Sequence, residues 1–229
     1  MLIRAVLIDV GGPILDEDHE YVAWDSFLLD FLKREGIQVE GEELARLIAS
    51  ATKRCEPNPR AAALWELCRP DVARFRRLRD AFREFRCRHL YVPRLRCGAR
   101  EALEELAARY TLALAGNQPI RIKRYLAEAG VLDLFRWQLV SEEMGVEKPD
   151  TLFFRMILDG LGVSPKDAVM VGDRLDHDVV PARLLGMRAV RVLVGPYAEQ
   201  VPCSVLHRPD RAIGALEELP AVLDGGLLG

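Results

Sequence analysis

Two short apolar segments of this 229-residue chain end in acidic residues. The first runs to Asp9 and then turns through the letters VGGP; the second, AVMVGD, ends at Asp173, with Asp178 five residues later. A carboxylate in such a position can act as a nucleophile or help to hold a hard cation such as Mg²⁺. Open α/β sheets carry their reactive groups at the carboxyl ends of their strands. Because Asp is also common in turns and at helix N-caps, Asp9 alone leaves a structural role open as well.

Alternating apolar and amphipathic segments are the elements that would position these acids. The apolar segments have the pattern of buried strands and cover residues 2–8, 111–117, 137–143, 168–174 and 188–195. The amphipathic segments predict helices at residues 99–109, 120–129, 151–161 and 178–185. Glycines that are typical of helix C-termini follow three of them, at Gly130, Gly162 and Gly186. This alternation predicts a parallel sheet with helices on both faces, with Asp9, Gly116 and Asp173 at the carboxyl ends of neighbouring strands.

The region from Leu15 to Val92 lacks strand signals and shows helical periodicity instead. Its apolar residues form three stripes, at residues 21–32, 44–51 and 75–89. The pattern predicts an all-helical domain at residues 15–92, inserted into an α/β core made of residues 1–14 and 93–229. Seven arginines between Arg74 and Arg88 are interpreted as a solvated face, with an anionic partner as the alternative. His89 lies on the third stripe and is interpreted as a core residue.

Composition and charge narrow the classes of partner. Half of the residues are hydrophobic, the net charge is −3 and the pI is about 5.9, which gives no argument for binding to nucleic acid or to a membrane. No segment approaches ~20 uncharged apolar residues, and the first apolar run is too short for a signal peptide, so we expect a cytoplasmic protein. The five cysteines are odd in number and lack metal-site spacing, which argues against a disulfide framework or a zinc site.

Four segments together carry a family pattern. They are IDVGGP around Asp9, LALAGN ending at Asn117, GVEKPD around Lys148, and VMVGDRLDHD with Asp173 and Asp178. In this order they resemble the four motifs of the haloacid dehalogenase superfamily of hydrolases, and the helical insertion after the first motif resembles the C1 cap of that superfamily. The resemblance implies a Rossmann-like parallel sheet flanked by helices, with an inserted helical cap domain.

The resemblance also implies roles for individual residues. Asp9 would be the nucleophile that forms an aspartyl-phosphate, and Lys148 would neutralise the phosphate and steady Asp9. Mg²⁺ would be bound by Asp9, the backbone carbonyl of Gly11, Asp173 and Asp178. The phosphate of a small phosphorylated metabolite would be bound by Gly11, Gly12, Gly116, Asn117 and Lys148. Taken alone, Lys148 would be interpreted as a surface lysine before a proline that starts a helix. The alternative role for Asp173 and Asp178 is helix N-capping, which the combined pattern disfavours.

Two positions depart from the phosphatases of this superfamily. Gly11 stands where those enzymes carry a second Asp as general acid, and Gly116 stands where a Ser or Thr hydroxyl usually binds the phosphate. General acid catalysis is worth roughly 10²- to 10⁴-fold in rate. We therefore expect a slow phosphatase, an acid recruited from Asp16, Asp18 or His19, or a substrate whose leaving group needs no proton, such as an acyl phosphate.

Three other functions remain open at this stage. A 2-haloacid dehalogenase needs no leaving-group proton, but it uses no metal, so Asp173 and Asp178 argue against it. A phosphonate hydrolase would need a Schiff-base lysine, and Lys33 and Lys53, the lysines of the insertion, lie in no recognisable motif. A module that binds Mg²⁺ and a phosphorylated ligand without turnover would explain Gly11 and Gly116. The substrate and the oligomeric state do not follow from the sequence.

Overall fold

The computed structural model describes residues 2–89 and 92–225. The chain forms two compact units. The first contains the segments up to Asp16, from Pro93 to Ala198 and from Pro202 onward, and the second contains Glu17 to Val92 with Glu199 to Val201. Among the described residues, no helix has the length and apolar character needed to cross a membrane.

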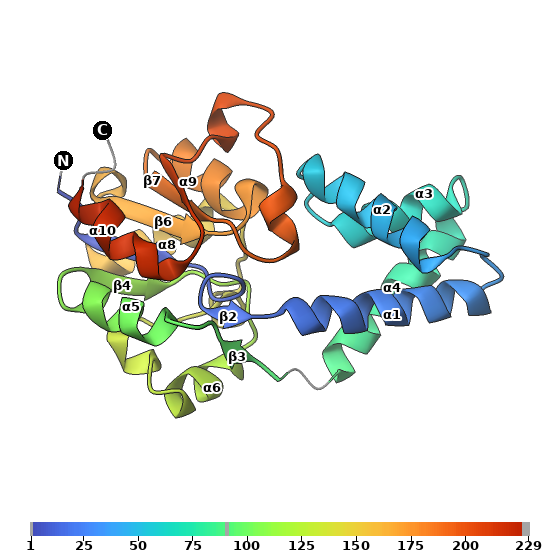
Figure 1. Cartoon of the computed structure of the whole chain (residues 1–229), viewed down its shortest axis with the longest axis horizontal. Coiled ribbons are helices and arrows are strands. Elements are labelled where there is room, and N and C mark those ends of the chain that lie inside the picture. Colours follow the sequence, from blue (N-terminus) through green and yellow to red (C-terminus); the bar gives the residue numbers. More distant parts are fainter. Residues whose placement is uncertain (1, 90–91, 226–229) are drawn as a thin grey trace. The chain divides into compact units, whose positions relative to one another are not determined.

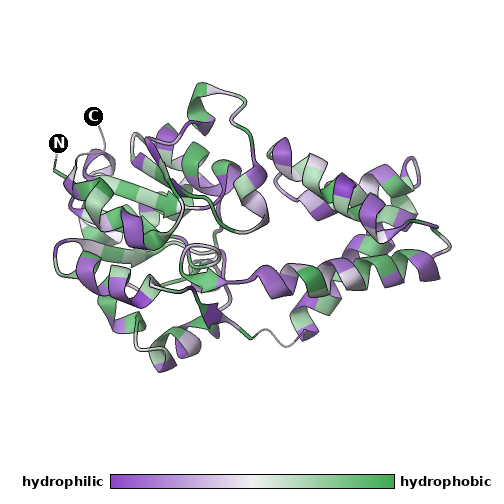
Figure 2. Ribbon diagram, viewed as in Figure 1, coloured by the Kyte–Doolittle hydropathy of each residue, from purple (hydrophilic) through white to green (hydrophobic). Residues whose placement is uncertain are grey.

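The first unit is built on a six-stranded parallel sheet with the strand order β5-β4-β1-β6-β7-β8. Its strands are β1 (Ala5–Ile8), β4 (Thr111–Leu114), β5 (Phe135–Trp137), β6 (Ala168–Gly172), β7 (Arg188–Val192) and β8 (Arg211–Ile213). All four residues of β1 are fully buried, because β1 lies in the middle of the sheet and both of its faces are covered. Figure 2 shows the hydrophobic colour along the central strands. The predicted fold class is confirmed.

Helices cover both faces of this sheet (Figure 1). They are α5 (Ala99–Ala107), α6 (Ile122–Glu128), α7 (Ser141–Met144), α8 (Thr151–Leu161), α9 (Val180–Leu184) and α10 (Leu219–Asp224). α5 packs against α10, and α8 packs against α9. The glycines predicted to end three helices have positive φ angles, of 69° at Gly130, 64° at Gly162 and 80° at Gly186. Side chains rarely tolerate this conformation, which explains glycine at these positions.

A short two-stranded antiparallel sheet lies where the chain leaves the first unit and returns to it. β2 (Leu15–Asp16) pairs antiparallel with β3 (Arg94–Leu95). The Arg96 amide then donates to the Ile14 carbonyl at 2.9 Å, which extends the pairing by one bond. Leu15 and Asp16, which the sequence placed in the insertion, therefore belong to the first unit.

The second unit consists of four helices with their own core. They are α1 (Asp18–Arg34), α2 (Gly41–Lys53), α3 (Pro59–Cys68) and α4 (Val72–Arg88). Leu28 and Leu32 of α1, Leu64 of α3 and Leu78 of α4 are fully buried and form the centre of that core. Most arginines of α4 are exposed. His89, at the end of α4, is half-buried, and its Nε2 lies 3.1 Å from a buried Glu20 oxygen.

The structure corrects three details of the predicted elements. Residues 137–143 are not a strand: β5 ends at Trp137 and α7 begins at Ser141, where the Glu143 carboxylate accepts from the Val140 amide at 3.1 Å and so starts a helix. The helix expected at residues 178–185 is a π-helical turn at Leu175–Val179 followed by α9. The edge strand β8 and the two-stranded sheet of β2 and β3 were not predicted from the sequence, because strands of two or three residues show no periodicity. None of the five cysteines forms a disulfide in the structure.

Candidate active site

Three parallel strands end side by side in the middle of the sheet. β1 pairs with β4 on one side and with β6 on the other, in a register that places Ile8 level with Leu114 and Val171. Asp9 follows β1, Gly116 comes two residues after β4, and Asp173 follows β6. The three predicted residues therefore lie at the same edge of the sheet, as the sequence led us to expect.

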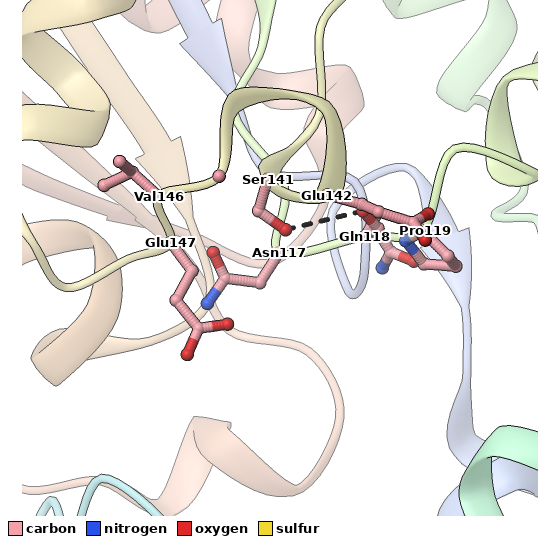
Figure 3. A pocket seen from close by; sticks show the side chains of 8 residues that line it. Asn117, Gln118, Pro119, Ser141, Glu142, Val146 and Glu147 are labelled. Atoms are coloured by element: carbon pink, nitrogen blue, oxygen red, sulfur yellow. Dashed lines mark hydrogen bonds between the residues drawn. The ribbon is translucent and has the colours of Figure 1, made fainter.

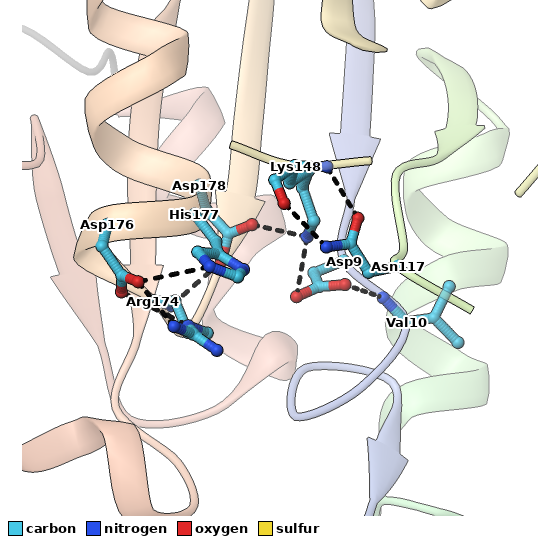
Figure 4. Close-up of polar contacts among 8 residues, drawn as sticks. All are labelled: Asp9, Val10, Asn117, Lys148, Arg174, Asp176, His177 and Asp178. Carbon is cyan, nitrogen blue, oxygen red and sulfur yellow. Dashed lines mark hydrogen bonds and ion pairs between the residues drawn. The ribbon is translucent and has the colours of Figure 1, made fainter. Parts of the chain in front are cut away.

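Lys148 joins two of the acids. Its Nζ lies 2.9 Å from Asp9 Oδ2 and 2.6 Å from Asp178 Oδ1 (Figure 4). The other oxygen of Asp9 accepts from the Val10 amide at 2.7 Å, and the other oxygen of Asp178 accepts from the Arg174 amide at 3.0 Å. All three charged side chains are buried. Burial by itself would lower the pKa of Lys148, but the charges of Asp178 and Asp9 raise it above its usual value, so the lysine is held as a cation.

Asp173 lies in the same cluster but differs from the other two acids. One carboxylate oxygen from each of Asp9, Asp173 and Asp178 lies within 4.8 Å of the others. Within the described part of the chain, the Asp173 carboxylate accepts no hydrogen bond. Burial, together with the charges of Asp9 and Asp178, raises its pKa well above the usual range. Burial raises the pKa of Asp178 as well, against the opposing effect of Lys148.

This arrangement fits a divalent cation. Three buried carboxylates face one lysine, which leaves an excess of negative charge where desolvation is costly. Clustered carboxylate oxygens are hard ligands of the type that Mg²⁺ prefers. A cation bound among Asp9, Asp173 and Asp178 would offset the repulsion that raises the pKa of Asp173.

Two glycines allow these acids to pack closely. Gly12 has a φ of +87°, and a Cβ atom placed on it would lie 2.8 Å from Asp173 Cγ. A Cβ on Gly172 would lie 2.2 Å from the Asp178 carboxyl carbon. Since real Cβ atoms do not approach other atoms this closely, both positions require glycine. The Gly12 amide donates to the Leu15 carbonyl at 3.0 Å, so this predicted phosphate contact is already engaged within the loop.

The segment after β4 supports Lys148. The Asn117 side chain donates to the Lys148 carbonyl and accepts from the Lys148 amide, both at 2.8 Å (Figure 4). Asn117, which the sequence assigned to substrate, thus holds the main chain of the lysine in this structure. A Cβ on Gly116 would lie 2.8 Å from Val10 Cγ2. Because Val10 is fully buried, a serine or threonine does not fit at Gly116 without moving that side chain.

Two arginines outside the predicted site hold its main chain. Arg96 Nε donates to the Gly12 carbonyl at 2.5 Å. Arg191 of β7 is 5% exposed; its Nε donates to the Asp173 carbonyl at 3.3 Å and its Nη2 to the Tyr197 carbonyl at 2.6 Å. Neither arginine was predicted from the sequence. For Arg191 the available signal was a charged residue inside the apolar run AVRVLV.

The residues considered as substitutes for the general acid lie in two places. Asp16 is in the first unit, 4.0 Å from Arg96 Nη2. Asp18 begins α1 of the second unit. His19 also lies there, with its Nε2 3.0 Å from the Val92 carbonyl and 3.3 Å from a Glu20 oxygen.

A surface hollow adjoins the site on the β4 side. It has a volume of about 510 Å³ and is lined by residues that include Asn117, Gln118, Ser141, Glu142 and Glu147 (Figure 3). Ser141 Oγ donates to the Gln118 carbonyl at 3.4 Å across it. Asn117 contributes both to this hollow and to the support of the Lys148 main chain.

Comparison with known proteins gives these residues a family context. The HAD-hydrolase-like family model matches residues 146–219, the segment that contains Lys148, Asp173 and Asp178. A phosphoserine phosphatase from Thermus thermophilus is 39% identical over 149 residues, which are 64% of this chain and 56% of that protein. These matches support membership of the haloacid dehalogenase-like hydrolase superfamily.

A second relative within the superfamily is a glyceraldehyde 3-phosphate phosphatase from Methanopyrus kandleri. It is 40% identical over 94 residues, which are 41% of this chain and 40% of that protein. The matched part of this chain thus spans about half the length of the first of these curated relatives and less than half of the second. The crystal structure of a predicted phosphoglycolate phosphatase from Haemophilus somnus matches with a TM-score of 0.69 and 19% identity, over 96% of this chain and 98% of that one. This similarity supports the superfamily fold.

Proposed function

We propose that this protein is a magnesium-dependent phosphatase that acts on small phosphorylated metabolites through Asp9. The observation that carries the proposal is Lys148 Nζ, which contacts Asp9 and Asp178 together at 2.9 and 2.6 Å, in the same cluster as the Asp173 carboxylate. A nucleophile, a cation and a set of metal ligands are thereby assembled in one place. The relatives named phosphoserine phosphatase and glyceraldehyde 3-phosphate phosphatase support the same reaction class.

Asp9 is the residue that would react. One of its oxygens is fixed by the Val10 amide and the other faces Lys148, so the orientation of the carboxylate is set before substrate binds. Asp9 would attack phosphorus, forming a P–O bond while the bond to the leaving oxygen breaks. Water would then attack the aspartyl-phosphate, releasing inorganic phosphate and restoring the carboxylate.

Lys148 and the acids would balance the charges of this step. Lys148 would lower the repulsion between the Asp9 carboxylate and the phosphate, while Asn117 holds its main chain in place. Asp9, the Gly11 carbonyl, Asp173 and Asp178 would hold Mg²⁺, which when bound would neutralise charge on the phosphoryl oxygens. Asp178 keeps Lys148 oriented through its 2.6 Å contact.

The missing acid at Gly11 would shape the substrate preference. With no side chain at this position to protonate a departing oxygen, turnover would depend steeply on the leaving-group pKa. Nitrophenyl and acyl phosphates would react fastest, and alkyl phosphates slowly. The test is a series of phosphate monoesters with graded leaving groups, measured with and without Mg²⁺. A flat response, with chemistry shown to be rate-limiting, would mean that another residue supplies the proton.

The second candidate function is binding of Mg²⁺ and a phosphorylated ligand without turnover. The absence of a hydroxyl at Gly116, where an added Cβ would lie 2.8 Å from Val10 Cγ2, is the observation that favours it, together with Gly11. The assembled Asp9, Lys148 and Asp173 argue for catalysis instead. A Mg²⁺-dependent turnover of p-nitrophenyl phosphate that is lost in Asp9→Asn would exclude the binding-only function.

We also propose that the helical unit serves as the cap of the enzyme, in keeping with its insertion directly after the Asp9 loop. A variant in which residues 17–92 are replaced by a short linker tests this. It should retain turnover of p-nitrophenyl phosphate but lose discrimination among metabolites. Unchanged discrimination would contradict a role as cap.

A further inference from the structure

The turn after Asp9 has no side chain at its glycines that could hold its shape. Gly12 has a φ of +87°, a conformation that glycine adopts at little steric cost. Pro13 has no N–H, so the Gly12–Pro13 peptide can be held only through the Gly12 carbonyl. Gly12 and Pro13 are buried, and buried carbonyls normally accept a hydrogen bond. The partner of this carbonyl therefore decides how firmly the turn is held.

That partner is Arg96, on the segment that returns from the helical unit. Its side chain is 21% exposed, and its Nε donates to the Gly12 carbonyl at 2.5 Å. Its amide donates to the Ile14 carbonyl at 2.9 Å, and its Nη2 lies 4.0 Å from Asp16 Oδ1. One residue thus contacts the turn at Gly12, Ile14 and Asp16.

The main chain before Arg96 is fixed on two sides. Leu95 of β3 pairs with Leu15 of β2. The Leu95 amide also donates to the Tyr125 hydroxyl of α6 at 3.1 Å. The Arg96 side chain therefore extends toward Gly12 from an anchored backbone.

The same turn sets the direction of the Gly11 carbonyl. The Gly12 amide donates to the Leu15 carbonyl at 3.0 Å. The Gly11–Gly12 peptide is trans, so its C=O and N–H point in opposite directions and the Gly11 carbonyl is directed away from Leu15. Gly12 also packs against Asp173, since an added Cβ would lie 2.8 Å from Asp173 Cγ. A movement of Gly12 would therefore disturb both the Gly11 carbonyl and the Asp173 carboxylate.

We propose that Arg96 is a positioning residue for the metal ligands of this loop. By holding the Gly12 carbonyl, Arg96 keeps the Gly11 carbonyl and the Asp173 carboxylate in place for Mg²⁺. The inference rests on the proposed function, because it takes these two groups as metal ligands. A guanidinium is suited to this task, since it is always charged and its hydrogen bonds are stronger than those of neutral donors. Groups that orient metal ligands commonly change metal affinity by about 10- to 100-fold.

The hold on the loop is measured first without metal, by hydrogen exchange of the assigned Gly12 backbone amide in the presence of a chelator. Arg96→Met removes the donor but keeps an aliphatic side chain. The Gly12 amide should then exchange roughly tenfold faster or more, because the turn opens more often. Arg94→Met removes the same charge from an exposed position two residues earlier and should leave the exchange unchanged. Native exchange of Gly12 in folded Arg96→Met would overturn the proposal.

Mg²⁺ binding to the same variants is measured by calorimetry. Arg96→Met should raise the Kd for Mg²⁺ by roughly 10- to 100-fold, and Arg96→Lys, which keeps a charged donor, should recover most of the affinity. At saturating Mg²⁺, kcat of Arg96→Met for p-nitrophenyl phosphate should return close to native, which a loss of folded protein would not allow. Native Mg²⁺ affinity in Arg96→Met, or an equal loss in Arg94→Met, would overturn the proposal.

The two measurements separate this proposal from the proposed function. If the native protein binds no Mg²⁺, the proposed function fails. Faster exchange of Gly12 in Arg96→Met would in that case still support Arg96 as the residue that holds the loop.

Discussion

Lys148 Nζ lies 2.9 Å from Asp9 Oδ2, and both side chains are buried at the carboxyl edge of the sheet. Lys148 Nζ also contacts Asp178, so in the absence of metal its positive charge offsets the negative charges of these acids. Breaking a buried ion pair by removing one partner typically costs about 3 to 5 kcal/mol, because the remaining charge is left uncompensated.

Lys148→Met should therefore lower the free energy of unfolding by a few kcal/mol and abolish turnover. The decrease in the free energy of unfolding should be larger at pH 8 than at pH 5. Burial already raises the pKa of Asp178 in the folded state, and loss of the lysine raises it further, so stability present below the unfolded pKa is lost as pH rises through the folded pKa. Urea denaturation at both pH values measures this. Lys166→Met, at an exposed position, is the control, and an equal loss in the two variants would contradict the account.

Asp173→Asn should stabilise the metal-free protein and remove its response to Mg²⁺. The Asp173 pKa is raised by burial and by neighbouring acids, so its ionised form is a source of strain above the unfolded pKa of about 3.8. A metal at 100 times its Kd adds about 2.7 kcal/mol of stability, which the variant should not gain. Thermal unfolding with and without Mg²⁺ tests both effects. An unaltered Mg²⁺ response would exclude Asp173 as a ligand, with Asp133→Asn as the exposed control.

Gly12→Ala should impair the site beyond the cost of backbone strain. Gly12 and Gly186 have similar φ angles, of 87° and 80°, but only the added Cβ at Gly12 would meet the Asp173 carboxyl group; nothing lies within 4 Å at Gly186. Both alanine variants should lose about 1 to 3 kcal/mol of stability from the positive φ. Only Gly12→Ala should also weaken Mg²⁺ binding, measured by calorimetry. Equal Mg²⁺ affinities in the two variants would show that the contact with Asp173 is unimportant.

Arg191 is expected to act as a positioning residue for Asp173. Loss of groups that orient metal ligands commonly reduces metal affinity by about 10- to 100-fold. Arg191→Met should therefore weaken Mg²⁺ binding by that factor. Arg188→Met, on the same strand, breaks a 3.0 Å contact with Asp210 and should reduce stability without changing Mg²⁺ affinity. If both variants retain native Mg²⁺ affinity, Arg191 stabilises β7 and does not position the metal ligand Asp173.

The sequence predicted the edge where the site would assemble, because three strand-ending residues in a parallel sheet must meet there. It did not predict how Lys148 is shared between Asp9 and Asp178, or that Asn117 holds its main chain, since these contacts depend on side-chain packing. Arg96 and Arg191 were missed for a similar reason: their targets are backbone carbonyls, which have no sequence signature. Trp137 was placed at the start of a strand instead of its end, because Val140 is buried in a loop and has the same apolar character as a strand residue.

In the proposed reaction Asp9 forms a covalent intermediate, and the release of p-nitrophenolate followed on the millisecond scale would detect it. In related phosphatases the acid absent here at Gly11 also activates water, so its loss should slow breakdown of the aspartyl-phosphate more than its formation from an activated ester. If Asp9 is the nucleophile, we expect a Mg²⁺-dependent burst of up to one p-nitrophenolate per site, followed by slower turnover. Both phases should be absent in Asp9→Asn. Native turnover in Asp9→Asn, without a burst, would contradict it.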